Sequence, residues 1–541
     1  MPGGGIQWLK NDVRGTVRYG LLPLTTVRGG EVKLRLLIFV VCLLAAATAG
    51  SEQKHSGGTN VILFIGDGFG AAQMALGIRY ARMVEGRKLH LEQLMNDGNT
   101  GYALASPYGS QVTDSAAAAS QLATGVKVRN ETLSLNPSGY PVETILEWAE
   151  DRGLATGIVT TTRLSHATPA AFAAHQISRY EPEPVILDQI LFEHDVDVLL
   201  GGGARALIPA GHRVSEFLPG IAVELDGDSN RVDELDRISG AREKGYTIVS
   251  DREALARASP NAKKLLGLFA ASSVPYVVDS RAMGLGGVPS LKDSTTAALE
   301  VLARSDTGFF LMVEGGLIDW GGHDNDAGTM LHEILDFDLA LGAGIAFQRT
   351  HPETLIIVTA DHGTGGFSFT YEELDGKPAP QVLMSGLSYH PDTRYPERRH
   401  LEILGKQSAS FLHMLEAAAG SAERLIKIVR EHTSLSLTME EAREVLVRDS
   451  EGNAWLEERR HFYGDPGSNP ACLLGRALAR QTFVAWSTGG HTSEPLLTFG
   501  RGPGAEGLRG IYDNTHVYDV IKSVLGGTKI GESESNVRVK N

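Results

Sequence analysis

Residues 113–120, with the sequence TDSAAAAS, place a serine hydroxyl directly after a carboxylate and at the start of an alanine-rich stretch. Such a stretch favours a helix, and the first turn of a helix presents unpaired N–H groups and a partial positive charge. Ser115 is therefore a candidate nucleophile toward an anionic group such as phosphate. The alternative is that Ser115 and Asp114 only cap the helix, as these residue types commonly do.

Residue types that bind metal ions recur further along the chain. Asp319 and His323 are four residues apart, so they could share a helical face or a tight loop, and His491 could complete their set. Two imidazoles and a carboxylate suit Zn²⁺ with an open coordination position. Asp361 and His362 are adjacent, so both could reach one site only where the backbone turns at the end of a strand.

Other positions offer oxygen ligands. Glu314 and Thr168 supply only oxygens, which suits a harder ion such as Mg²⁺. Asp67 lies between two glycines that permit close backbone approach, and it could bridge two ions. Several other polar residues are expected on helix surfaces or at helix caps instead: His175, His194, His332, His351, His390, Asp336 and Asp338.

Short apolar segments alternate with amphipathic, helix-like ones. The strand-like segments are residues 61–65, 156–161, 196–200, 309–313 and 354–359, and helices are expected at 142–151 and 328–348. This alternation predicts an α/β fold, a three-layer sandwich with a central, mostly parallel sheet flanked by helices. Ligands of such sheets bind beyond the carboxyl ends of the strands, and the polar residues above follow four of these segments.

The alternation of strand-like and helix-like segments is interrupted between residues 371 and 480, where charged helical segments surround a polar stretch with Pro and Arg residues. We expect an insertion there, acting as a lid or an oligomer contact. The core is expected to comprise residues 50–370 and 481–527, with strands at 482–486 and 495–499 and a closing helix at 515–525. A polar tail occupies residues 528–541.

Charge and the N-terminal leader indicate where the protein acts. The net charge of −15 argues against a nucleic-acid-binding module, and an acidic protein that handles phosphate needs local positive charge, which metal ions can supply. Within the leader (residues 1–49), residues 33–49 predict a signal peptide cleaved near Ala49, with an uncleaved anchor as the alternative. Export to the periplasm or medium, with no membrane span in the mature chain, follows. Cys472 then has no intramolecular disulfide partner.

Six ordered motifs carry a resemblance to the alkaline phosphatase family: FIGDG (64–68), TDSAA (113–117), HATPA (166–170) running on to SR (178–179), VEGGLID (313–319), TADHG (359–363) and GGHT (489–492). Each motif is modest alone, but their ordered set is specific. The matching segments span residues 61–518, the insertion excepted.

The resemblance implies hydrolysis of phosphate monoesters through a phosphoserine on Ser115, with Arg179 binding two phosphate oxygens. It implies two Zn²⁺ ions per subunit, one bound by Asp319, His323 and His491, the other by Asp67, Asp361 and His362 and in contact with the Ser115 oxygen. Asp67, Thr168 and Glu314 resemble a third, Mg²⁺-type site. Asp114 is expected to position Arg179 or the helix start, and a homodimer is the family habit.

Two residues depart from the best-known bacterial member of the family. His166 stands in place of an aspartate near the third metal, and Trp320 in place of a lysine; both occur together in other bacterial members. A nearby histidine softens the third site, which could favour Zn²⁺ or Co²⁺ over Mg²⁺. The competing functions are a related phosphodiesterase, a sulfatase or other superfamily hydrolase, and a phosphate-binding protein with an inactive site.

Overall fold

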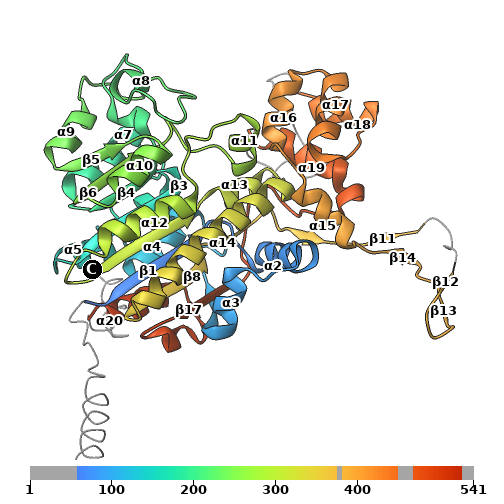
Figure 1. The fold of residues 1–541 in the computed structure, drawn as a ribbon, viewed down its shortest axis with the longest axis horizontal. Helices are drawn as coiled ribbons and strands as arrows, with labels where there is room; N and C mark the ends of the chain where they lie inside the picture. Colours follow the sequence, from blue (N-terminus) through green and yellow to red (C-terminus); the bar gives the residue numbers. More distant parts are fainter. Residues whose placement is uncertain (1–57, 375–379, 449–466, 527–541) are drawn as a thin grey trace, which may run out of the picture. The chain divides into compact units, whose positions relative to one another are not determined.

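The computed structural model describes residues 58–374, 380–448 and 467–526 of the chain (Figure 1). The predicted leader with its signal peptide and the polar tail lie outside these residues. No helix within the described ranges is both long enough and apolar enough to cross a membrane.

A ten-stranded sheet forms the centre of the fold, in the order β18-β2-β17-β8-β1-β7-β3-β4-β6-β5. Only β17 runs against its neighbours, and all other pairings in this sheet are parallel. The strands are β1 (Asn60–Gly66), β2 (Asn99–Leu104), β3 (Ala155–Arg163), β4 (Val198–Gly202), β5 (Tyr246–Val249), β6 (Lys264–Leu268), β7 (Phe309–Gly315), β8 (Thr354–Ala360), β17 (Leu496–Arg501) and β18 (Gly510–Asp513). The predicted, mostly parallel sheet is confirmed.

Helices cover both faces of this sheet, because its central strands are apolar on both sides. Val61, Leu63 and Ile65 of β1 pack into one apolar core, while Ile62 and Phe64 pack into the other. The first face is covered by α4 (Ser115–Thr124), α5 (Ile145–Glu150), α6 (Ala167–Ala170), α7 (Glu183–Asp188), α8 (Val214–Phe217), α9 (Arg237–Glu243) and α20 (Thr515–Val524).

The second face carries the longest helix, α14 (Ala327–Thr350), which lies beside α12 (Leu291–Leu302) across the strands in Figure 1. The same core receives side chains from α2 (Ala71–Tyr80), α3 (His90–Asp97), α10 (Arg252–Ala258), α13 (Leu317–His323) and α15 (Arg398–Gly405). A short helix, α11 (Val277–Ala282), packs against Leu317. The predicted three-layer arrangement is thereby confirmed.

The segment predicted as an insertion builds an apolar core of its own. Helices α16 (Phe411–Ala418), α17 (Ala422–Thr433), α18 (Met439–Leu446) and α19 (Asn469–Thr482) pack around Met414, Leu425 and Leu474. Before them, short pairs β11 (Glu372–Glu373) with β14 (Thr393–Arg394) and β12 (Gln381–Val382) with β13 (Ser388–Tyr389) form a hairpin. Asp326, at the start of α14, accepts hydrogen bonds from the Phe411 N–H and the Gln407 amide, which tie these helices to the core.

One predicted core strand is wrong. Residues 482–486 do not join the large sheet: α19 continues to Thr482, and β15 (Val484–Ala485) pairs only with β10 (Ser368–Phe369). An apolar run this short is compatible with either a helix end or a strand, and the helix-forming residues before it extend α19. The predicted strand at 495–499 and the closing helix are present as β17 and α20.

Candidate metal centre

Strand register brings three carboxylates to one edge of the sheet. Ile65 of β1 lies beside Glu314 of β7 and Thr359 of β8, so Asp67 and Asp361 both follow directly where the strands end. Gly68, with φ of +66°, turns the chain there and donates its N–H to Asp361 at 3.1 Å. A Cβ at this position would lie 2.8 Å from the Cα of Asp319, so close backbone approach requires glycine.

The first candidate ion site contains Asp67, Asp361 and His362. The Nε2 atom of His362 lies 3.4 Å from Asp67 Oδ1 and 3.2 Å from Asp361 Oδ2. Because β8 ends at Ala360, the adjacent Asp361 and His362 can both turn toward the same point. The Ser115 hydroxyl lies 3.1 Å from the same His362 nitrogen, so the candidate nucleophile adjoins this site.

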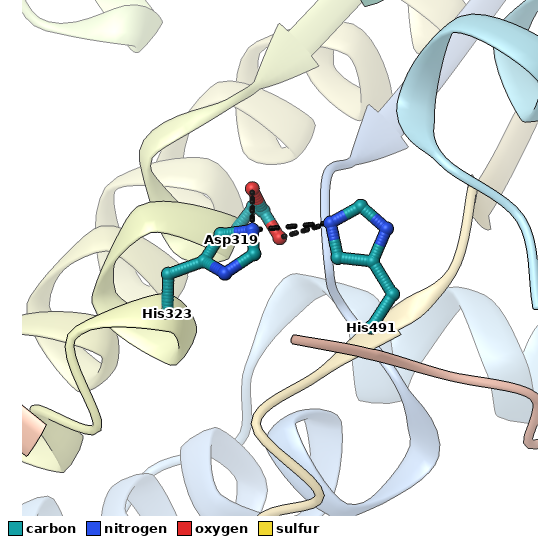
Figure 2. A group of neighbouring side chains, drawn as sticks. All are labelled: Asp319, His323 and His491. Carbon is teal, nitrogen blue, oxygen red and sulfur yellow. Dashed lines mark hydrogen bonds and ion pairs between the residues drawn. The ribbon is translucent and has the colours of Figure 1, made fainter. Parts of the chain in front are cut away.

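The second candidate site contains Asp319, His323 and His491, whose side chains point toward one another in Figure 2. Asp319 and His323 lie one turn apart on α13, and His323 Nε2 is 3.3 Å from Asp319 Oδ2. His491 is brought in by the antiparallel pairing of β16 (His491–Thr492) with β9 (Gly363–Thr364). Its Nε2 lies 3.1 Å from Nε2 of His323 and 3.7 Å from Asp319 Oδ1.

Backbone carbonyls orient both imidazoles of this second site. Nδ1 of His323 lies 2.6 Å from the Gly489 carbonyl oxygen, and Nδ1 of His491 lies 2.9 Å from that of Thr113. Each Nδ1–H can donate to its carbonyl, which leaves the Nε2 lone pairs of the two rings facing each other. Two facing lone pairs repel unless a cation lies between them, and histidine metal ligands typically donate their other ring N–H to a carbonyl or carboxylate oxygen in this way.

The third candidate site lies around Asp67 and Glu314. Thr168 donates to Asp67 Oδ2 at 3.3 Å, and ligand atoms of Asp67, His166 and Glu314 lie within 4.8 Å of one another. Thr160 and Thr162, both of β3, contact Glu314 Oε2. His166 is therefore placed to add a nitrogen to a group otherwise made of oxygens.

The buried atoms of these groups fit bound cations. Asp67 Oδ1, Asp361 Oδ2, Glu314 Oε1 and His166 Nδ1 are all buried without a hydrogen-bond partner. Buried polar atoms in proteins are nearly always paired, so four orphaned ligand atoms in one cluster point to partners of another kind. Metal ions satisfy both the atoms and the local excess of negative charge.

The pKa directions support the same interpretation. Burial, added to neighbouring carboxylates, raises the pKa of Glu314 to about 7 and that of Asp361 to about 6, and it raises that of Asp67 well above its ordinary range. Burial lowers the pKa of His362 to about 4 and that of His491 to about 3. Burial acts in the same direction on His323, but the Asp319 carboxylate outweighs it and raises the pKa of His323 to about 9, so a bound cation would have to displace that proton. Neutral imidazoles are the form that binds metals, and crowded carboxylates need a nearby positive charge.

Ser115 is the first residue of α4, and Asp114 rather than Ser115 is the N-cap. Asp114 Oδ1 accepts from the Ala117 N–H at 3.0 Å, and its Oδ2 lies 3.1 Å from Nη1 of Arg179. Burial opposes ionisation of Asp114, but Arg179 and the backbone N–H groups hold its pKa below the ordinary value. The other terminal nitrogen of Arg179 lies 3.3 Å from His166 Nε2.

Sequence reasoning missed some residues that contact these groups. Thr364 donates to Asp319 Oδ1 and lies 3.2 Å from Nδ1 of His362, so it joins two candidate sites. Its place just after the motif TADHG was the available signal. The histidines set aside from the sequence (His175, His194, His332, His351 and His390) belong to none of the candidate ion groups found within the described residues. Asp336 and Asp338 accept from the first turns of α12 and α3, so they do cap helices, although Asp338 is buried rather than solvated.

Comparisons with known proteins identify the family. The profile of the family described as "Alkaline phosphatase" matches residues 58–526. Alkaline phosphatase 3 of Bacillus subtilis is 29% identical over 497 residues, covering 90% of this chain and 94% of that protein. Streptomycin-6-phosphate phosphatase of Streptomyces griseus is 36% identical over 389 residues, covering 64% of this chain and 82% of that protein.

A solved structure of this family is also similar to the chain. The crystal structure of Thermus thermophilus alkaline phosphatase is 31% identical and matches with a TM-score of 0.74, covering 91% of this chain and 98% of that one. The chain therefore belongs to the alkaline phosphatase family, whose members are metal-dependent phosphomonoesterases. It is accordingly a phosphoric monoester hydrolase, as the motifs predicted.

Proposed function

We propose that this enzyme hydrolyses phosphate monoesters to an alcohol and inorganic phosphate through a phosphoserine on Ser115. The observation that carries the proposal is the 3.1 Å distance between the Ser115 hydroxyl and His362, in a cluster of buried ligand atoms without partners. A serine with only a capping role has no need of such a neighbourhood, because Asp114 already caps α4.

Three ions are assigned to the three groups. One Zn²⁺ would be held by Asp319, His323 and His491, and a second by Asp67, Asp361 and His362. The third, in the family a Mg²⁺-type site, would be held by Asp67, Thr168 and Glu314. We expect Zn²⁺ or Co²⁺ to compete there, because His166 adds a nitrogen donor. Together such ions supply Lewis acidity that stabilises the attacking and leaving oxygens of an in-line displacement.

Side chains of the protein bind the phosphoryl group and provide the nucleophile. Arg179 presents the planar fork that suits two phosphate oxygens, and Asp114 holds that fork in place. Ser115 attacks the phosphorus, the ester oxygen leaves with the alcohol, and water later releases phosphate from the serine. The first turn of α4 places its partial positive charge beside the group that is transferred.

Recognition of the phosphoryl group dominates this site, so a range of alcohols is expected. One relative is named streptomycin-6-phosphate phosphatase. The runner-up is a phosphodiesterase or another hydrolase of the superfamily. Diesterases usually have threonine as nucleophile and lack an arginine like Arg179, which favours the monoesterase.

Two measurements test the proposal. Monoester and diester turnover are compared under the same conditions, and elemental analysis is combined with assays before and after chelation. We expect monoesters to be strongly preferred, with zinc as the main bound metal and activity lost on chelation and restored by zinc. Equal turnover of diesters, or activity indifferent to thorough chelation, would contradict the proposal.

We also infer that the protein is exported and dimeric. The signal-like segment 33–49 supports export, and mass analysis of the mature N-terminus tests cleavage near Ala49. Exposed apolar side chains at the β12–β13 turn, among them Met384 and Leu387, support a self-contact of the kind the family habit implies. Sedimentation analysis of the wild type and of Met384→Asp tests the dimer.

A further inference from the structure

An open cavity of about 730 Å³ lies beside the metal-ligand helix α13. One wall is Trp320 of α13, and a second includes Met283, just beyond α11. Helix α16, from the segment between residues 371 and 480, supplies a third with Leu412 and Glu416. The cavity therefore lies between the core of the enzyme and the predicted insertion.

Trp320 connects this cavity to the phosphate-binding residues. It directly follows the ligand residue Asp319, and its ring meets that of His166 edge to face, with centroids 6.1 Å apart. Nε2 of His166 in turn lies 3.3 Å from Nη2 of Arg179. Trp320 therefore adjoins both the cavity and the residues assigned to the phosphoryl group, so it is the place where the alcohol part of an ester bound on Arg179 and Ser115 would enter the cavity.

Apolar side chains that are exposed to solvent line this cavity. Leu225 is 59% exposed, Met283 is 40% exposed and Leu412 is 36% exposed, and all three line it together with Trp320. Exposed apolar side chains that converge on one concavity are typical of a ligand site rather than of scattered surface residues.

The charged groups of the walls are nearly all acidic. Asp226, Asp279 and Glu416 line the cavity, His413 is its one histidine, and no lysine or arginine is among its described lining residues. Asp279 is committed to the Ser410 N–H, 2.7 Å away, whereas Asp226 and Glu416 are exposed at the rim. An anionic group entering the cavity therefore meets repulsion, and a cationic group meets attraction.

We propose that this cavity binds the alcohol part of the substrate and selects apolar or cationic alcohols, such as substituted phenols and amino alcohols, over anionic ones. The inference rests on the proposed monoesterase function and deepens it. It assigns part of the segment 371–480 to substrate selection, through α16. Trp320, Leu412, Met283 and the two rim acids are its specificity-determining residues.

The test uses two aryl phosphates that differ in charge, the phosphate esters of 4-(aminomethyl)phenol and of 4-hydroxybenzenesulfonate. The ratio of their kcat/KM values is measured for the wild type and for the double variant Asp226→Asn/Glu416→Lys. Asparagine suits position 226, because φ there is +56°. Since ratios are compared between enzymes, the intrinsic reactivities of the two esters cancel.

We expect the wild type to prefer the cationic ester and the double variant to lower that preference about tenfold. The inhibition constant of inorganic phosphate, which has no alcohol part, is expected to stay unchanged. Glu444→Lys is the matched control, because Glu444 is an exposed acid of α18 that does not line the cavity.

A second variant tests the apolar wall without any change of charge. Leu412→Ser is expected to lower kcat/KM for 2-naphthyl phosphate about threefold to tenfold relative to ethyl phosphate. An unchanged charge ratio in the double variant, or an equal shift in Glu444→Lys, overturns the inference while leaving the proposed function intact. Failure of the wild type to hydrolyse any of the four esters refutes the proposed function itself.

Discussion

The two carboxylate oxygens of Asp114 have different partners. Oδ2 forms an ion pair with Arg179 at 3.1 Å, while Oδ1 caps α4 by accepting from the Ala117 N–H at 3.0 Å. One side chain thus positions both the arginine proposed to bind phosphate and the helix that begins with Ser115.

This double role is separable by two substitutions. Asp114→Asn keeps a good N-cap but loses the charge that holds Arg179, so we expect kcat/KM to fall about 10- to 100-fold with little change in stability. Asp114→Ala should show the same kinetic loss and also lose about 1 kcal/mol of stability. Phosphate inhibition and chemical unfolding measure the two effects; full activity in Asp114→Asn would remove Asp114 from any positioning role.

Ser115→Ala tests the nucleophile. The change removes one oxygen from the buried start of α4, and we expect kcat to fall roughly 10³-fold or more, with metal content unchanged. Labelled substrate, acid quenching and peptide mapping should find phosphate on the Ser115 peptide of the wild type alone. Label on the same peptide of the variant would refute the assignment.

The metal-binding role of the imidazole pair in the second candidate site can be tested by comparing a variant of one of its histidines with a variant of a histidine outside the site. Since His323 Nε2 faces His491 Nε2 at 3.1 Å, His323→Asn should lose about one ion per chain and most activity. His332→Asn is the control, because Nδ1 of His332 contacts Arg281 instead. Elemental analysis measures the metal content of both variants, and equal metal content in the two would contradict the assignment of His323 as a metal ligand.

Metal removal should destabilise the fold as well as abolish activity. Asp67, Asp361 and Glu314 are fully buried near one another, so without cations their charges oppose folding. Ions present at a thousandfold excess over their dissociation constants add about 4 kcal/mol per site. Thermal unfolding with and without chelator should therefore show a large fall in Tm that zinc reverses, and an unchanged Tm would argue against bound ions.

Glu333 of α14 should make stability depend on pH. Burial, with Asp336 and Asp279 nearby, raises its pKa to about 8 from an ordinary 4.5, against the opposing effects of Arg281 and the Val277 N–H. A raised folded-state pKa means that stability is fully present below pH 4.5 and is lost as pH rises through 8. Glu333→Gln keeps an acceptor for Val277 and removes this loss.

We therefore expect the variant to gain a few kcal/mol over the wild type at pH 9 and less than about 1 kcal/mol at pH 5. Denaturant unfolding of both proteins at the two pH values measures the gain. Comparing the proteins at each pH cancels the titration of all shared groups. The same difference at pH 5 and pH 9 would show that Glu333 does not titrate in this range.

Much of the fold was predictable from the sequence. The buried strands are nearly continuous apolar runs, so β1, β3, β4, β7 and β8 were predicted to within two residues at each end, as was the long helix α14. The strands β2, β5, β6 and β18 were missed, because they are short or mix apolar with polar residues. Pattern alone also misassigned residues 482–486, which lie where α19 ends.

The sequence by itself determined which residue types were available for the chemistry: a serine behind a helix cap, an arginine, and carboxylates and imidazoles at strand ends. The tertiary structure decided which of them meet. His491 joins Asp319 and His323 only through the pairing of β16 with β9, and Arg179 meets Asp114 across 65 positions of the chain. Residue type and local pattern are properties of short segments, whereas these meetings depend on strand register and packing between segments far apart in the chain.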